Sequence, residues 1–207
     1  VYTFGNWGVL GAVIFKNWLV RDLNDMKSEF TNNRYGLDFG FSNDPAALVC
    51  AHYDKMRKTI YIYDELYEKG LTNQYLAYRV SVILQNREAM VVCDSAEPKS
   101  IAELRQHKVN AVKASKGKDS IVHGIQWLQG MQIIIDSKCV NTQTEFSMYK
   151  WKEDAHGNVL PEPNDSNNHL IDALRYAMER DAQGGAEVSI DATILNYIRS
   201  ADEEPAF

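Results

Sequence analysis

The stretch of sequence that decides the fold is Tyr35-Gly36-Leu37-Asp38-Phe39-Gly40-Phe41. Large apolar residues alternate in it with small or acidic ones, and this period of two predicts a β-strand with two unlike faces. One face is an aromatic and aliphatic core surface, and the other carries Asp38 between two glycines. Glycine inside a strand marks the close approach of a ligand or of another backbone. A carboxylate in such a cleared space favours a metal ligand over a solvated aspartate.

Length and composition predict one sizeable domain with a real hydrophobic core. The 207 residues are 45% hydrophobic and carry a net charge of −6. Any contact of so acidic a chain with nucleic acid has to come from a local basic patch or a bridging cation. The three cysteines lack metal-ligand spacing, which predicts free thiols in a reducing compartment. No apolar run is long enough for a membrane span.

The order of the predicted elements indicates an α/β fold. Short connections predict an antiparallel meander of three strands, at residues 34–41, 46–53 and 58–67. Apolar runs at 89–94, 109–113 and 131–135 then alternate with helical patterns, which predicts a mixed sheet flanked by helices. We expect residues 1–33 to be a remnant and linker of a preceding domain, residues 34–182 to be the folded domain, and residues 183–207 to be a flexible tail.

A second acid, Asp94, ends the apolar run that begins at Ala89. Such a run predicts a strand buried on both faces, hence a central one. The carboxyl end of a central strand is a usual position for a ligand site. An aspartate there can equally cap the following helix. The presence of Asp38 on another central strand favours the ligand site.

The third acid, Asp172, lies on a predicted amphipathic helix at residues 168–180. At about 100° per residue, the apolar residues form one stripe and Asp172 lies opposite, with His169 and Tyr176 within about 60° of it. This face is either solvated or turned into a cleft. His169 favours the cleft, because imidazole is a common metal ligand or proton carrier, although a lone histidine is more often structural.

Asp38, Asp94 and Asp172 together predict a divalent-metal site. Acids from two strands and a helix can hold two Mg²⁺ or Mn²⁺ ions about 4 Å apart. One ion would activate water, and the other would neutralise the leaving oxygen of a phosphodiester. Oxygen ligands with little thiolate favour these hard cations over structural zinc.

Three sequence blocks are specific as an ordered set: Gly36-Leu-Asp-Phe-Gly-Phe-Ser-Asn-Asp-Pro-Ala-Ala-Leu48, Cys93-Asp-Ser-Ala-Glu-Pro98 and Asn168-His-Leu-Ile-Asp-Ala-Leu-Arg-Tyr-Ala177. Together they resemble the nuclease domain of the large terminase subunit of tailed double-stranded DNA bacteriophages. Residues 113–121 also resemble that family, and residues 5–15 resemble the segment that joins its ATPase domain to its nuclease domain. On this resemblance, residues 1–33 are the remnant of a preceding ATPase domain.

The resemblance implies a ribonuclease H-like fold and a metal-dependent endonuclease that cuts concatemeric double-stranded phage DNA during packaging. It implies that Asp38, Asp94 and Asp172 bind the metal, and His169 matches a catalytic-site histidine found in part of the family. The implied partners are DNA, the portal protein and the terminase small subunit, in the host cell cytoplasm at the procapsid. The family's ATPase needs a Walker loop, and this sequence has none, so we expect DNA cleavage without ATP hydrolysis.

The densest basic stretch lies between residues 99 and 118, although such runs usually form a solvated face. We expect Lys113, Lys116 and Lys118 to make weak phosphate contacts that position DNA without reading its sequence. Likeness to the family adds Lys152, on a predicted hairpin at residues 150–160 that would gate DNA entry.

Three other interpretations stay open. An actin-like or sugar-kinase-like ATPase also starts with Asp-x-Gly, as in Asp38-Phe-Gly40, but it needs a second lobe for which this chain is too short. A resolvase or polynucleotidyl transferase of the same superfold would prefer branched DNA or transfer a strand. A non-catalytic DNA- or portal-binding module would carry these acids as structural residues. The sequence also leaves open whether Asp44, Glu97 or Asp165 joins the metal shell.

Overall fold

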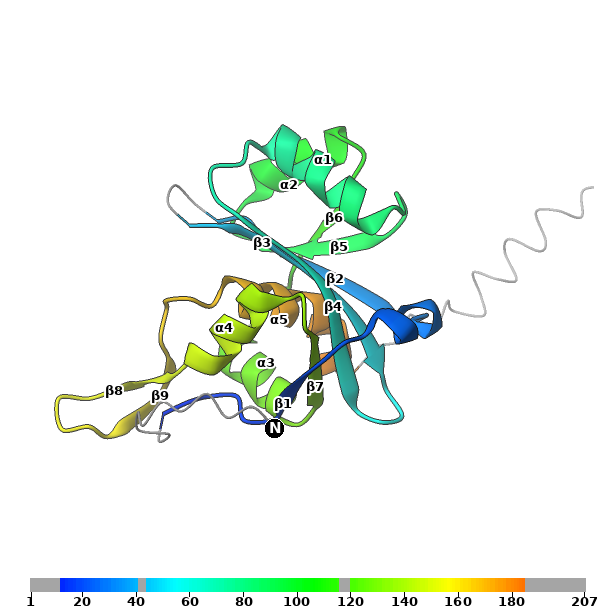
Figure 1. Ribbon diagram of the computed structural model, residues 1–207. Coiled ribbons are helices and arrows are strands. Elements are labelled where there is room, and N and C mark those ends of the chain that lie inside the picture. The colour runs from blue at the N-terminus through cyan, green and yellow to red at the C-terminus, as the bar shows by residue number, and fades with distance from the viewer. Residues whose placement is uncertain (1–11, 41–43, 116–119, 185–207) are drawn as a thin grey trace, which may run out of the picture.

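The computed structural model describes residues 12–40, 44–115 and 120–184, built around a seven-stranded mixed sheet (Figure 1). Its strands are β1 (Trp18–Arg21), β2 (Asn33–Asp38), β3 (Ala46–Asp54), β4 (Thr59–Glu68), β5 (Met90–Cys93), β6 (Asn110–Lys113) and β7 (Gln132–Asp136). From edge to edge the order is β1-β7-β4-β3-β2-β5-β6. β3 runs antiparallel to both neighbours, and every other pairing in this sheet is parallel.

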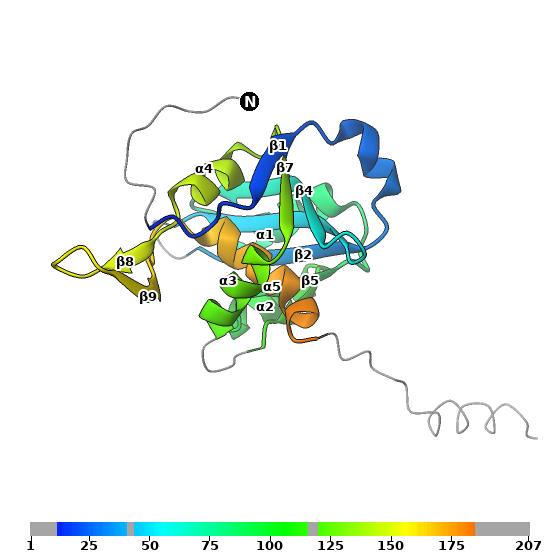
Figure 2. The same ribbon diagram turned by 90° about the horizontal axis from the view of Figure 1, so that it is seen from below.

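Helices cover both faces of the sheet (Figures 1 and 2). One face carries α1 (Asn73–Leu84) and α2 (Pro98–Gln106), and the other carries α3 (Ser120–Gln129), α4 (Val140–Met148) and α5 (His169–Ala182). A separate hydrophobic core lies under each helical layer. Across the described residues, no helix combines the length and the apolar character that crossing a membrane requires.

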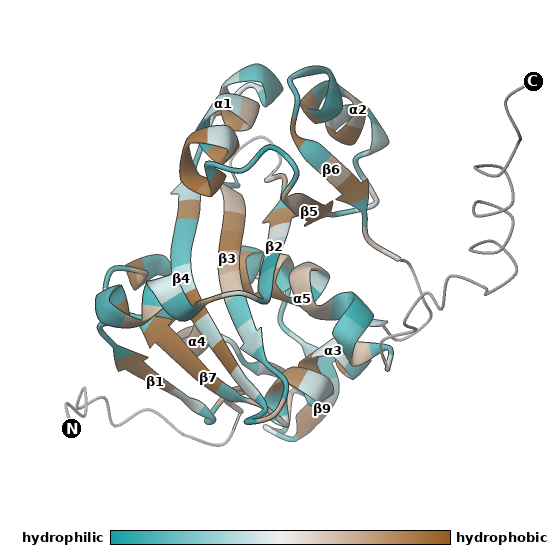
Figure 3. Ribbon diagram, turned by 90° about the vertical axis from the view of Figure 1, so that its right-hand side faces the viewer, coloured by the Kyte–Doolittle hydropathy of each residue, from teal (hydrophilic) through white to brown (hydrophobic). Residues whose placement is uncertain are grey.

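The expected α/β class is confirmed: three antiparallel strands come first, and parallel strands alternating with helices follow. The strands predicted at 34–41, 46–53 and 58–67 correspond to β2, β3 and β4, with small shifts at their ends. β3, β5 and β7 are hydrophobic along most of their length, as strands covered on both faces must be (Figure 3). Phe41, the last residue of the first predicted strand, lies outside the described residues.

The two faces of β2 differ as its alternation predicts. Leu37 and Phe39 are buried in the core under α1 and α2. On the opposite face, a Cβ atom on Gly36 would lie 1.8 Å from the Ala173 carbonyl oxygen of α5. Gly36 therefore marks the close approach of a helix backbone, and α5 lies directly on the strand that ends at Asp38.

Residues 12–33 are not the expected linker. β1 pairs in parallel with β7 and forms one edge of the sheet. Phe15 and Leu23, on either side of β1, are 1% and 0% exposed. The prediction failed because β1 has four residues, mostly exposed, and so lacks the alternation that identifies longer strands. Residues 1–11 lie outside the described part of the chain, so their origin stays a prediction.

The segment before β1 is joined to the start of the hairpin formed by β8 (Trp151–Glu153) and β9 (Val159–Pro163). The Ile14 N–H donates to the Tyr149 carbonyl at 3.0 Å, and the Trp151 N–H donates to the Ala12 carbonyl at 2.8 Å. Val13 and Lys150 form an isolated antiparallel bridge between these contacts. The N-terminal segment and the hairpin therefore share one backbone network.

The hairpin expected at residues 150–160 is present but longer. Its turn is closed by Asp154, whose N–H donates to the Asn158 carbonyl at 2.9 Å, and Gly157 adopts a φ of +82°. β9 includes Pro161 and Pro163. A two-stranded hairpin tolerates proline, since each strand has an unpaired edge on which no N–H is needed.

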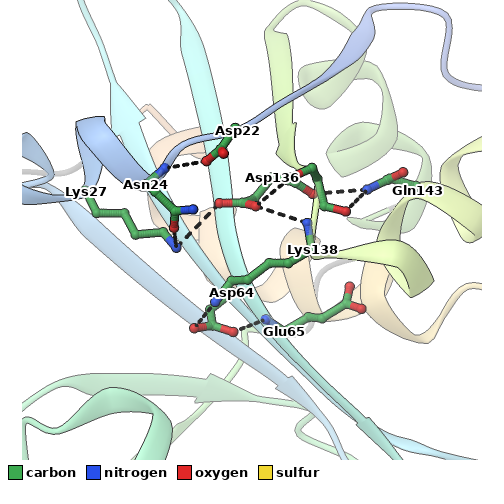
Figure 4. Close-up of polar contacts among 9 residues, drawn as sticks. Asp22, Asn24, Lys27, Asp64, Glu65, Asp136, Lys138 and Gln143 are labelled. Atoms are coloured by element: carbon green, nitrogen blue, oxygen red, sulfur yellow. Dashed lines mark hydrogen bonds and ion pairs between the residues drawn. The ribbon is translucent and has the colours of Figure 1, made fainter. Parts of the chain in front are cut away.

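A polar cluster at the end of β7 holds the 3₁₀-helix η1 (Asn24–Glu29) against the sheet (Figure 4). Asp136 is 1% exposed, and its Oδ2 lies 3.4 Å from the Lys27 ammonium. Beside it, the Lys138 ammonium donates to Oδ2 of Asp64 at 2.7 Å. Each of these acids thus faces a lysine, and the cluster anchors residues that the sequence suggested were a linker.

β4 contains a β-bulge that the sequence did not indicate. The register of the β3–β4 pair shifts between Cys50 and Ala51, because β4 has one extra residue. Ile62 consequently lies in the core under α3, α4 and α5, whereas Leu66 lies in the core under α1 and α2. The simple alternation of a strand, which would place both on one face, is interrupted by the bulge. Beyond the bulge, Glu65 faces the start of α4.

Candidate metal centre

Two of the three predicted acids lie at the carboxyl ends of adjacent parallel strands. Asp38 is the last residue of β2, and Asp94 directly follows β5. The Asp94 N–H donates to the Leu37 carbonyl at 3.1 Å, which fixes the two backbones side by side. Both acids line one cleft of about 410 Å³. The other ionisable residues along its wall are Asp44, Glu97 and His169.

A tight turn after β2 brings the loop back toward this cleft. Gly40 has a φ of +44°, and a Cβ atom there would lie 2.3 Å from the Pro45 backbone. Only glycine fits such a turn without strain. Asp44, just before Pro45, lies on the cleft wall with 59% of its side chain exposed. Asp44 therefore lines the same cleft as Asp38, and whether it joins a metal shell stays a prediction.

His169 contacts the first acid directly. Its Nδ1 lies 2.9 Å from Oδ2 of Asp38, and its Nε2 lies 3.8 Å from Oδ1 of Asp44. The hydrogen bond to Asp38 raises the pKa of His169 above its ordinary value, while partial burial opposes that rise. The helix start therefore presents an imidazole with one nitrogen held by a carboxylate and the other facing the cleft.

Asp172 adjoins these groups but does not line the cleft. Its Oδ1 accepts from the Arg175 guanidinium at 3.0 Å, and its Oδ2 accepts from the Asn168 amide at 3.1 Å. Burial raises the pKa of Asp172, the Arg175 charge opposes this, and the charge of Asp38 adds to it. Asp172 is thus close enough to Asp38 for their charges to interact, with its oxygens turned to neighbours on α5.

Tyr176, one turn along α5 from Asp172, is influenced by the charges of all three acids. Burial raises the pKa of its hydroxyl, and the charges of Asp172, Asp94 and Asp38 each raise it further. One side chain therefore lies within electrostatic reach of acids that are far apart in the sequence. The helix face predicted to carry Asp172, His169 and Tyr176 is the face turned toward the strand ends.

The carboxylates fit a hard divalent cation by their chemistry. The cleft wall supplies oxygen ligands from Asp38, Asp44, Asp94 and Glu97, and no thiolate. Among the described residues, no three His, Cys, Asp or Glu side chains are already gathered around one point as a metal site requires. Because Arg175 engages Asp172, the third acid would have to release that partner to join a shared ion.

The remaining candidate residues lie in the cleft, on the hairpin and at the edge of the sheet. Glu97 lines the cleft, whereas Asp165 pairs with Lys152 on the hairpin at 3.3 Å. Lys152 also lies 2.5 Å from Glu162, so two acids already engage its ammonium. Lys113 is exposed at the end of β6. The other two predicted DNA contacts, Lys116 and Lys118, lie outside the described residues.

Two buried residues near the site escaped the sequence analysis. Arg175, 8% exposed, neutralises Asp172, and it resembles a solvent-facing arginine in the sequence. Glu145 of α4, 2% exposed, accepts hydrogen bonds from the Leu170 and Ile171 N–H groups at the start of α5. The spacing of Arg175 from Asp172 was a usable signal, since residues three apart meet on a helix. No local signal points to Glu145.

Comparisons with known proteins agree on one family. The model of the family described as "Terminase RNAseH like domain" matches residues 38–180. The large terminase subunit of Bacillus phage SPP1 is 38% identical over 184 residues, covering 84% of this chain and 43% of that protein. The PBSX phage terminase large subunit of Bacillus subtilis (strain 168) is 29% identical over 70% of this chain and 34% of that protein. The chain thus spans less than half the length of these curated relatives.

Solved structures give the same result. The nuclease domain of the SPP1 large terminase, crystallised with bound Mn, superposes with a TM-score of 0.77 at 36% identity, covering 82% of this chain and 99% of that chain. The large terminase of a thermophilic bacteriophage matches with a TM-score of 0.64 at 22% identity, over 81% of this chain and 45% of that one, which supports the fold. The predicted ribonuclease H-like fold is confirmed. This chain belongs to the terminase RNase H-like domain family.

Proposed function

We propose that this domain is a divalent-metal-dependent endonuclease that cleaves double-stranded DNA for a phage packaging terminase. The observation that supports this best is the open cleft that Asp38 and Asp94 line at the ends of β2 and β5, with Asp172 of α5 adjoining it. The SPP1 nuclease domain with bound Mn, which shares the fold at 36% identity, adds support for a metal.

Asp38 and Asp94 are the residues that would hold the metal, with Asp44 and Glu97 on the same wall as further oxygen ligands. Asp172 joins them once it releases Arg175. Bound Mg²⁺ or Mn²⁺ ions, two in our proposal, supply charge stabilisation at the phosphodiester and a more acidic attacking water. The protein holds the backbones of these residues in place. A hydrogen bond joins the ends of β2 and β5, and α5 packs directly on β2.

His169 is the candidate for proton transfer. Its Nδ1 is engaged by Asp38, so Nε2 is the nitrogen that can exchange a proton with the substrate in the cleft. In the metal-free domain, the hydrogen bond to Asp38 raises the pKa of His169 above its ordinary value. In the proposed reaction, protonated Nε2 donates its proton to the leaving oxygen of the cleaved strand.

The proposed substrate is concatemeric double-stranded phage DNA, bound weakly by this domain alone. Its net charge of −6 repels the phosphate backbone, and Lys113 is the described lysine best placed for a phosphate contact. Contacts with the portal protein and the terminase small subunit belong to the full-length protein in our proposal. Packaging at a procapsid in the host cytoplasm is the setting that this function implies.

Cleavage of supercoiled plasmid DNA with Mn²⁺ tests the proposal. We expect the wild-type domain to cut, EDTA to stop cutting without unfolding the domain, and Asp38→Ala to abolish it. Asp54→Ala is a matched control, since Asp54 is an acid paired with Arg57 in a turn away from the cleft. Equal cutting by wild type and Asp38→Ala would show that the acids are not the site. No cutting with any metal would favour a non-catalytic binding module, and preference for branched DNA would favour a resolvase.

A further inference from the structure

The N-terminus of α5, the helix that carries His169 and Asp172, is not capped by the side chain of its own N-cap residue. The first N–H groups of any α-helix lack partners within the helix and need acceptors from elsewhere. In α5 the N-cap residue is Asn168, and its side chain makes no capping bond. Its amide instead donates to Oδ2 of Asp172 at 3.1 Å. The start of α5 therefore depends on an acceptor from another part of the chain.

Glu145 of α4 is that acceptor. Its Oε2 accepts from the Leu170 N–H at 2.8 Å and from the Ile171 N–H at 3.2 Å. These residues directly follow His169, so the bonds fix the turn on which the imidazole is mounted. The carboxylate is 2% exposed, and α4 packs beside α5 on the same face of the sheet (Figure 1). A negative charge at a helix N-terminus is also favoured by the helix dipole.

The same carboxylate lies close to the groups of the cleft. Its charge contributes to the raised pKa of His169, and the His169 charge in turn acts on Glu145. Tyr67, whose ring centre lies 6.5 Å from that of His169, lies beside Glu145 as well. The second oxygen, Oε1, is buried and has no hydrogen-bond partner among the described residues. Glu145 thus combines a structural contact with proximity to the imidazole.

The helix that carries Glu145 is held by a second carboxylate, on β4. Glu65, turned inward beyond the bulge of β4, accepts from the Asn141 N–H at 3.0 Å and from the Thr142 N–H at 2.9 Å. The Thr142 hydroxyl donates to it at 2.6 Å. The N-cap residue of α4, Cys139, makes no side-chain capping bond. Glutamates from neighbouring elements therefore fix α4 to β4 and α5 to α4.

We propose that Glu145 is a positioning residue for the nuclease reaction, which holds the first turn of α5 so that His169 and Asp172 face Asp38. The role rests on the proposed nuclease function, although the helix contact itself does not. Glu145 touches neither the cleft nor DNA, so it acts on the turnover of bound DNA and leaves DNA affinity unchanged. This role depends on the acceptor oxygen of Glu145 more than on its charge, because the two N–H groups are the hydrogen-bond partners of that oxygen.

The test compares Glu145→Ala, Glu145→Gln and wild type in plasmid cleavage with Mn²⁺, well below the melting temperature of each. We expect Glu145→Ala to lower kcat by about 10- to 100-fold, as loss of a supporting residue around a metal site does, with KM for DNA unchanged. Glu145→Gln keeps an acceptor oxygen and should restore most of kcat. Exchange of the Leu170 and Ile171 amide hydrogens, followed by NMR without metal or DNA, should be faster in Glu145→Ala.

Asp181→Ala is the matched control, because Asp181 is a buried carboxylate at the far end of α5, paired with Arg34 and Lys55. It should lower the melting temperature while leaving kcat and the two exchange rates at wild-type values. Should Glu145→Ala fail to fold, Glu145→Asp replaces it, since the shorter side chain withdraws the acceptor by one methylene. Wild-type kcat in a variant that lacks the acceptor would overturn the proposal, and so would unchanged amide exchange. If the wild type does not cut, the nuclease function fails, and the exchange rates still decide whether Glu145 holds α5.

Discussion

Nδ1 of His169 lies 2.9 Å from Oδ2 of Asp38, so the first residue of α5 is bonded to the last residue of β2. The contact spans 131 positions of sequence and closes the cleft on its helix side. It also makes the two residues electrically dependent, because the carboxylate raises the pKa of the imidazole. Changes at either residue are therefore expected to affect both the chemistry and the local electrostatics of the site.

Asp38→Asn should abolish DNA cleavage and leave the fold intact. The variant loses a metal ligand and the charged partner of His169, but it also removes a charge that repels Asp172. These electrostatic effects oppose each other, so we expect the free energy of unfolding to stay within about 1 kcal/mol of wild type. Urea unfolding and plasmid cleavage measure the two outcomes. A sharp fall in melting temperature would contradict this account.

The free energy of unfolding should fall as the pH rises from 4.5 toward 7, because of Glu145. Burial raises its pKa from 4.5 to about 7, while the N–H groups of Ile171 and Leu170 oppose that rise. The folded state therefore binds the proton more tightly than the unfolded state, and this stabilisation, on the order of 3 kcal/mol, is present at low pH and lost above the folded pKa. Urea unfolding from pH 4 to pH 8 measures it.

Glu145→Gln is the control for that pH dependence, since glutamine does not titrate. The raised pKa of His169 acts in the same direction, but its effect begins only near the ordinary pKa of 6.5 and extends above it. The difference between wild type and Glu145→Gln should therefore appear mainly between pH 4.5 and 7. Parallel stability curves for the two proteins across this range would show that Glu145 keeps an ordinary pKa.

Gly36→Ala should destabilise the domain and impair the site, because the new methyl group would lie 1.8 Å from the Ala173 carbonyl oxygen. α5 has to move away from β2, and overpacking of this kind costs about 1–3 kcal/mol or more. Gly70→Ala is the comparison: it has a φ of +71° but no atom within 4 Å of the new methyl group. Differential scanning calorimetry should show the larger loss for Gly36→Ala. Equal losses would mean that the helix contact at Gly36 costs no more than the strained backbone at Gly70.

Phe15→Ala should be among the most destabilising changes, although it precedes the predicted domain boundary. Phe15 is 1% exposed and packs against Phe146 in a tilted ring pair at 4.9 Å between ring centres. Truncating a buried phenylalanine costs about 3–5 kcal/mol. Leu19→Ala, on the exposed edge strand at 37% exposure, should cost far less. Urea unfolding separates the two, and a stable Phe15→Ala domain would restore the linker interpretation.

The sequence predicts how the candidate acids are oriented, because each one belongs to a local pattern. The alternation of β2 places Leu37 and Phe39 in one core and Asp38 toward α5, and the structure agrees. The helical stripe around Leu174 likewise predicts which face of α5 is buried. Such patterns report which side of an element faces the core, and this was enough to bring Asp38, Asp94 and Asp172 to one edge.

These local patterns could not predict contacts between distant elements. The bond from Glu145 to Leu170 spans 25 positions, and nothing in the sequence around Glu145 distinguishes it from a solvated residue. The contact between Arg175 and Asp172 could have been predicted from their spacing. The metal-site hypothesis, however, assigned the same carboxylate to a cation. The bulge in β4 was missed because one extra residue leaves the composition of a strand unchanged. Of these misses, the contact of Glu145 with α5 is a tertiary one that no local signal reports.

The backbone hydrogen bonds between residues 12–14 and the start of the hairpin determine which contacts a mechanical load would strain first. The Ala12 carbonyl and the Ile14 N–H clamp the chain at Trp151 and Tyr149. A pull applied upstream of residue 12 would therefore strain the junction of α4 and β8 before it sheared the parallel bonds between β1 and β7. Because α4 also carries Glu145, which accepts hydrogen bonds from the first turn of α5, such strain would be passed on to the helix that carries His169.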